Sequence, residues 1–110
     1  ELKVVTALLE DASVPDLRKM CDLVKSKGEN YVGIIAAVQK EKGTGNICVC
    51  CGKKAIELGA HAGNIARETA KLAGGSGGGK PDSAMAGAKD ISKLSSALDS
   101  AVSIVEGMLK

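Results

Sequence analysis

Residues 74–82 read G-G-S-G-G-G-K-P-D, and they offer backbone chemistry more than side-chain chemistry. Glycine adopts backbone conformations closed to other residues and lets N–H groups approach a ligand closely. Several such N–H groups beside one lysine are typical of surfaces that lie against phosphate and sugar. The sequence therefore predicts a phosphate-facing platform made of Gly74, Gly75, Gly77, Gly78, Gly79 and Lys80.

The familiar glycine-rich nucleotide motifs do not fit this run. A P-loop requires Ser or Thr after its lysine, whereas Lys80 is followed by Pro81. A dinucleotide fingerprint must follow a strand, whereas a helical pattern precedes Gly74. A flexible linker is the remaining alternative. The shortness of the run, its helical flanks and its constrained Lys-Pro-Asp end favour an ordered loop.

Side chains that could catalyse a reaction or hold a metal are few. His61 is the single histidine, and no serine or cysteine stands in a nucleophile motif, so we assign no catalytic residue. A histidine just before a helical pattern is typical of a capping or surface position. Cys48 and Cys50 share one face of an apolar segment and Cys51 faces the other, without a second pair at zinc spacing. We expect these thiols and Cys21 to be buried, free and without metal.

The composition indicates one small domain with an aliphatic core. The chain has 110 residues, Tyr31 is its one aromatic residue, and Trp and Phe are absent. This argues against nucleic-acid binders that stack bases on aromatic rings. The net charge is +2, but residues 53–93 hold seven basic and four acidic side chains, a local excess of +3. Further phosphate contacts are therefore predicted for Arg67, Lys71 and Lys89.

The sequence contains no recognisable signal peptide and no apolar stretch of membrane length. Four cysteines without an export signal indicate reduced thiols, so we expect a cytoplasmic protein without membrane contact. The chain begins with Glu1 and not with Met, from which we expect a segment of a larger polypeptide.

The first half of the chain alternates strand and helix patterns. Residues 3–9 form an apolar strand pattern, and Ser13 then suits the N-cap of a helix that ends at Gly28. Residues 31–39 and 46–51 are apolar runs of strand length, which we expect to pair as an antiparallel hairpin. The first two strands, joined through a helix, should be parallel.

The second half is predicted to be mostly helical. Helical patterns cover about residues 60–73 and residues 90–109, with a Gly-rich loop, 74–82, between the two helices. The small residues of 83–88 suit tight helix packing. The expected fold class is α/β, of an α+β-like kind, with helices packed on a small mixed sheet of about three strands in one globular domain, residues 1–110.

The segment 74–88, G-G-S-G-G-G-K-P-D-S-A-M-A-G-A, resembles the signature of the DHHA1 domain. That domain type forms the C-terminal domain of alanyl-tRNA synthetases and also occurs beside DHH phosphoesterase domains. The family pattern is a glycine-rich run followed by Arg-Pro-x-x-Ala-Gln-Ala-Gly-Gly. Here Lys80 stands in place of the arginine, Met85 in place of the glutamine and Ala88 in place of a glycine. The apolar strands upstream extend the resemblance over most of the chain.

The resemblance implies a DHHA1-like fold and a tRNA-binding C-terminal domain of an alanyl-tRNA synthetase. Such a domain contacts the tRNA elbow, where the D and T loops meet. The parent enzyme would ligate alanine to its tRNA with ATP, Mg²⁺ and zinc, while this fragment would bind none of these cofactors and would be non-catalytic. The resemblance also allows a homodimer through other parts of the parent.

Two other interpretations stay open at this point. The same loop could hold a nucleotide's phosphates in the substrate-binding DHHA1 domain of a DHH-family phosphoesterase or nuclease. The continuation K-P-D-S-A favours the synthetase. Alternatively, the domain could be structural or dimerising, with a loop that binds nothing. The sequence upstream of Glu1 would distinguish the parents.

Overall fold

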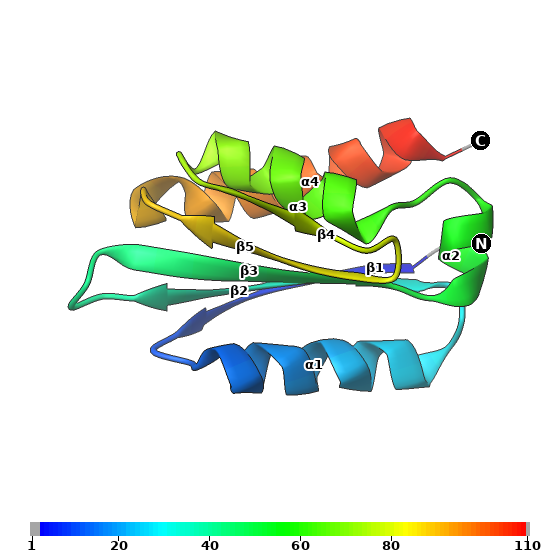
Figure 1. Cartoon of the computed structure of the whole chain (residues 1–110), viewed down its shortest axis with the longest axis horizontal. Helices are drawn as coiled ribbons and strands as arrows, with labels where there is room; N and C mark the ends of the chain where they lie inside the picture. Colours follow the sequence, from blue (N-terminus) through cyan, green and yellow to red (C-terminus); the bar gives the residue numbers. More distant parts are fainter. Residues whose placement is uncertain (1–2, 110) are drawn as a thin grey trace.

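The computed structural model describes residues 3–109, which form a five-stranded sheet with helices on both faces (Figure 1). The strand order across the sheet is β1-β2-β3-β5-β4, with β1 and β2 parallel and all other pairs antiparallel. Along the chain the elements are β1 (Lys3–Glu10), α1 (Val14–Lys27), β2 (Tyr31–Gln39), β3 (Thr44–Cys51), α2 (Lys53–Glu57), α3 (Ala62–Leu72), β4 (Ser76–Gly79), β5 (Ser83–Ala88), a 3₁₀ turn (Ile91–Lys93) and α4 (Leu94–Met108).

The first half follows the sequence prediction. Ser13 caps α1 and forms a capping box with Asp16, in which each side chain accepts a hydrogen bond from the other residue's backbone N–H. The β2 strand is buried along residues 32–38, which explains why its sequence is apolar without alternation. The parallel β1–β2 pair and the antiparallel β2–β3 hairpin are both confirmed.

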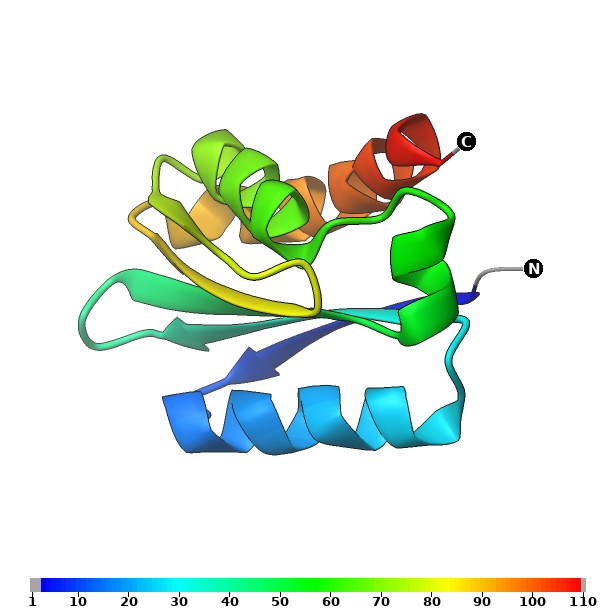
Figure 2. The same ribbon diagram turned by 45° about the vertical axis from the view of Figure 1, so that its right-hand side comes forward.

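The two faces of the sheet carry different layers. In Figure 1, α1 lies below the sheet, whereas α3 and α4 lie side by side above it. The turned view in Figure 2 keeps the same separation. The larger buried cluster lies under α3 and α4, and a smaller one lies between α1 and the sheet around Leu17, Cys21 and Ile35. The larger core is almost entirely aliphatic, as the composition predicts, whereas the smaller one also holds the thiols of Cys21, Cys48 and Cys50.

The prediction of a Gly-rich loop at 74–82 between two helices is wrong, and so is the estimate of about three strands. Residues 76–79 form the edge strand β4, which pairs with β5 through a short turn. Glycine has low β-propensity, so only tertiary packing reveals this strand. In β5, Ala84, Ala86 and Ala88 are buried at every second position, so the small residues of 83–88 form a strand instead of a helix-packing tail.

The glycines of this hairpin permit very close backbone contacts. A Cβ atom at Gly75 would overlap the carbonyl oxygen of Gly87 on β5. One at Gly63, on α3, would overlap the carbonyl oxygen of Gly79 on β4. The absence of side chains therefore lets α3 lie directly on β4 and lets β4 lie against β5.

The two predicted helices of the second half are confirmed with shifted ends, and one short helix was not predicted. The predicted helix at 90–109 is split into a 3₁₀ turn and α4, whose buried residues include Leu94, Leu98 and Val105. The five-residue helix α2 has no sequence signal, because it is shorter than two helical turns. Within residues 3–109, no helix combines the length and apolar character required to cross a membrane.

Candidate nucleic-acid interface

An open cleft of about 470 Å³ lies beside α1, on the face of the sheet opposite α3 and α4. It exists because α1 packs mainly on β2 and β3, whereas β4 and β5 pack against α3 on the other face. The outer half of the sheet is therefore uncovered on the α1 side. The lining comes from α1, β3 and the β4–β5 hairpin: Arg18, Cys21, Asp22, Lys25, Cys48, Cys50, Gly78, Gly79, Lys80, Ser83, Ala84 and Met85.

The rim of the cleft is basic. Arg18 and Lys25 line it from α1, Lys80 lines it from the β4–β5 turn, and Asp22 is the one acidic lining residue. Lys25 also pairs with Asp82 of the turn, with its Nζ atom 3.7 Å from the carboxylate. Within residues 3–109, no salt bridge engages Arg18 or Lys80, so their charges are available to an anion.

The inner wall of the cleft is made of thiols. Cys21 of α1 faces Cys48 and Cys50 of β3, and all three side chains are almost completely buried. Hydrogen bonds to Cys48 and Cys50, together with burial, raise the pKa of the Cys21 thiol. The hydrogen bond from Cys21 in turn lowers the pKa of both strand thiols. Cys51 faces the opposite core, where burial raises its pKa to about 12. All four cysteines are buried and free, as predicted.

The predicted glycine platform is only partly at the cleft. Gly78, Gly79 and Lys80 line it, at the end of β4 and in the turn that follows. Gly74 and Gly75 lie before β4, at the C-terminal end of α3, where the Gly75 N–H donates to Ala70. The platform is thus an exposed edge strand, and its last two glycines and the lysine are the part that the structure brings to the cleft.

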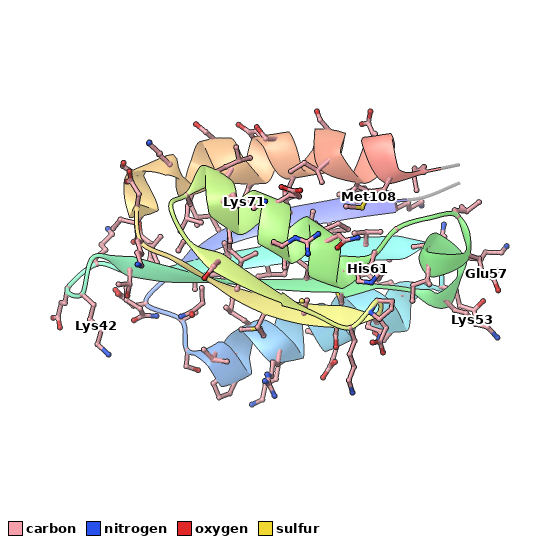
Figure 3. All side chains as sticks on the ribbon, turned by 45° about the horizontal axis from the view of Figure 1, so that its top comes forward. Lys42, Lys53, Glu57, His61, Lys71 and Met108 are labelled. Carbon is pink, nitrogen blue, oxygen red and sulfur yellow. The ribbon has the colours of Figure 1, made fainter. Side chains whose placement is uncertain are left out.

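The other predicted basic residues lie outside the cleft lining. Arg67 donates to Asn64 at 2.8 Å and Lys71 pairs with Glu68 at 3.7 Å, both within α3. In Figure 3, Lys71 lies at the opposite end of α3 from His61, on the helical layer that faces away from α1. Lys89 follows β5, where its N–H donates to Ala73. Contact of these three residues with phosphate therefore stays a prediction that competes with the cleft.

The N-terminus of α3 is closed by the protein itself. The N–H groups of Ala62 and Gly63 donate to the carbonyls of Pro81 and Lys80, at 2.9 and 3.1 Å. The Asn64 N–H donates to Nδ1 of His61 at 3.1 Å, so the histidine is a helix cap, in line with the sequence analysis. Because the N–H groups of the first helical residues are occupied, this helix end fixes the β4–β5 turn and does not serve as an anion seat.

Arg18 and Lys25 are the functional candidates that sequence reasoning missed. They are separated by seven residues on α1, which places them on one helix face with Cys21 and Asp22. That spacing was readable in the sequence. The sequence does not show that this helix face lies beside the turn at 80–82, because that turn is far along the chain and has no local signal of a hairpin.

Comparison with known proteins agrees with this architecture. The DHHA1 domain family matches residues 1–107. Alanine–tRNA ligase of Alkaliphilus oremlandii is 39% identical over 108 residues, which is 98% of this chain and 12% of the ligase. The ligase of Acetivibrio thermocellus is 40% identical over the same share of each chain. This chain therefore spans about an eighth of the length of these relatives.

A solved structure has the same fold. The crystal structure of the C-Ala domain from Aquifex aeolicus alanyl-tRNA synthetase superimposes with a TM-score of 0.79, covering 99% of this chain and 92% of that one at 22% identity. The mixed α/β architecture derived above is therefore shared with a domain of known structure. With the family match over nearly the whole chain, these findings establish that the chain belongs to the DHHA1 domain family.

Proposed function

We propose that this chain is the tRNA-binding domain of an alanine–tRNA ligase, and that it contacts the elbow of the tRNA through the cleft beside α1. The observation that carries the proposal is the convergence of Arg18, Lys25 and Lys80 on a cleft whose rim includes the bare backbone of Gly78 and Gly79. Basic side chains beside exposed backbone suit phosphate and ribose recognition. The relatives reported above are all alanine–tRNA ligases, so the phosphoesterase alternative is not favoured.

The chemistry of the cleft suits RNA shape more than RNA sequence. Its floor holds Met85 and Ala84, and the single aromatic ring, Tyr31, is not among its lining residues. Bases therefore have no aromatic ring to stack on at this site. Arg18 and Lys80 can each neutralise a phosphate, and Lys25 a third when it leaves Asp82, which predicts a salt slope of roughly −1.5 to −2.5 and modest affinity.

The ligase chemistry is proposed for the remainder of the parent enzyme, as are its ATP, Mg²⁺ and zinc. Within residues 3–109 no three His, Cys, Asp or Glu side chains are arranged as a metal site. We therefore propose the zinc centre for another part of the parent enzyme and assign no catalytic step to these side chains. The role proposed here is to bind and orient the tRNA.

The test is a binding titration of the chain with two RNAs. We expect an L-shaped tRNA transcript to bind, and an acceptor-stem minihelix without an elbow to bind much more weakly. Lys80→Ala and Arg18→Ala should each weaken tRNA binding by about 1 kcal/mol, roughly fivefold, and each should lower the salt slope by about one. Lys71→Ala, on α3, is the matched control and should change neither quantity.

Equal affinity for the minihelix would contradict recognition of the elbow. Equal losses for Lys71→Ala and Lys80→Ala would contradict the cleft as the site. Each variant must have the same unfolding midpoint as the unsubstituted chain, because a change in fold would obscure the comparison of affinities. Lys71 and Lys80 are both exposed, so we expect the midpoints to match.

A further inference from the structure

Three of the four thiols in the chain gather at the inner wall of the cleft, and neither the fold nor RNA binding requires their chemistry. Cys21 of α1 donates to the carbonyl oxygen of Cys48, with its Sγ atom 3.5 Å away. Cys50 donates to the carbonyl oxygen of Cys21, with its Sγ atom 3.3 Å away. The helix thiol thus lies against two strand thiols that point to the same face of β3.

The close approach of helix and strand is built into the sequence. Gly33 on β2 is paired with Cys50, and a Cβ atom at Gly33 would come within 2.9 Å of the Cys50 sulfur and 3.1 Å of Val24 on α1. Any larger residue would push α1 or the thiol away. Gly33 therefore keeps the sulfur atoms of α1 and β3 within a short distance of each other.

The surroundings favour reaction of these thiols over the fourth. All three line the open cleft. Besides the hydrogen bond from Cys21, the positive charge of Arg18 favours the thiolate of Cys48, and that of Lys25 favours the thiolate of Cys50. Cys51 lies on the opposite face of β3, fully buried in the larger core, and is not part of the cleft lining. Position on the cleft wall and the neighbouring cations therefore distinguish these thiols from Cys51.

We propose that Cys21 and the thiol pair on β3 form a modification site at which a small-molecule disulfide, such as glutathione disulfide, introduces an intramolecular disulfide bond. The thiolate of Cys48 or Cys50 attacks one sulfur of the small disulfide, forming a mixed disulfide and releasing one small thiolate. Cys21 then gives up its proton and attacks the protein sulfur of that mixed disulfide, which releases the second small thiolate. The two protein thiol protons end on the released thiols, so one disulfide is reduced as another forms.

Cys21 should take part in the disulfide bond whichever strand thiol is its partner. Cys48 and Cys50 are two residues apart on one strand with parallel side chains, which places their Cβ atoms about 6.6 Å apart. That separation exceeds the range of a disulfide. The bond should therefore join α1 to β3 and not span the strand.

The test oxidises the 110-residue chain with glutathione disulfide, removes the reagent and counts thiols by alkylation under denaturing conditions. We expect two of the four thiols to be lost, the intact mass to fall by two hydrogens without a retained glutathione, and reductant to restore both. Peptide mapping without reductant should link Cys21 to Cys48 or Cys50. This readout is independent of RNA, so it stands or falls separately from the proposed function.

Cys51→Ala is the matched control and should leave the reaction unchanged, whereas Cys21→Ala should abolish it. A stable glutathione adduct, a link to Cys51, a link between chains or no loss of thiols would each overturn the proposal. The peptide mapping uses the oxidised chain without any substitution, so the proposal remains testable even if Cys21→Ala fails to fold.

Discussion

The two faces of the sheet solve the same packing problem differently. On one face α3 packs on β3, β5 and β4 and α4 packs on β1 and β2, with the larger core beneath them. On the other face α1 covers only the inner strands, which leaves an open cleft lined by basic side chains and thiols. The covered face thus holds the glycine hairpin in place through α3, and the opposite face of the hairpin is left open at the cleft.

The basic residues follow the same division. Arg67 and Lys71 on the covered side have partners within their own helix, Asn64 and Glu68. Arg18 and Lys80 on the cleft side are in no salt bridge recorded for residues 3–109. The basic side chains thus divide into a set with partners inside α3 and a set at the cleft without a salt bridge among residues 3–109.

The largest effect expected from breaking this arrangement is at the contact between α3 and β4. Gly63→Ala should destabilise the chain by about 1–2 kcal/mol, because its Cβ would overlap backbone atoms of Gly79 and neither strand nor helix can yield easily. Gly107→Ala on α4 has open space and should be neutral or stabilise by up to about 1 kcal/mol. Urea unfolding of both variants measures the difference, and equal stabilities would contradict backbone-to-backbone packing.

A smaller effect is expected at the cap that fixes the turn. His61→Ala leaves the Asn64 N–H without its acceptor and should cost about 1 kcal/mol. His61→Asn keeps an acceptor and should recover most of that loss. Thermal unfolding of the pair checks the assignment; a full loss in the asparagine variant would show that packing of the imidazole, and not capping, is what matters.

Affinity for RNA can also be raised. Asp82→Asn removes the carboxylate that pairs with Lys25 at 3.7 Å and should free that lysine for phosphate. We expect tRNA binding to strengthen by roughly twofold to threefold at low salt, within the range of an exposed ion pair, and the gain to vanish at high salt. Unchanged or weaker binding in a filter or fluorescence titration would argue that Lys25 does not take part.

The smallest effect is expected at the cap of α1. The hydrogen bond from the Ser13 backbone holds the pKa of Asp16 below its ordinary value of 3.8. A carboxyl with a lowered folded-state pKa stabilises the fold above its unfolded pKa, and that contribution is lost as pH falls through the folded value. The difference in the free energy of unfolding between the unsubstituted chain and Asp16→Asn should therefore shrink in acid below pH about 4. A difference that persists at lower pH would contradict the capping box.

The sequence predicted the inner half of the fold well and the outer half poorly. The continuous apolar run of β2 and the Ser13 cap are local signals, and both were readable. The hairpin of β4 and β5 is formed from glycine and alanine, which have low strand propensity, and its stability depends on α3 lying directly on it. The turn at Lys80 has no local signal for the same reason, so the position of Arg18 and Lys25 beside it could not be predicted.

The central claim is that RNA meets the uncovered face of the sheet. Backbone amide resonances of the chain, followed during titration with a tRNA transcript, test it most directly. The account predicts that shifts and broadening concentrate at Gly78, Gly79, Lys80 and the Arg18–Lys25 face of α1. Changes concentrated instead on the outer face of α3, around Arg67 and Lys71, would contradict it.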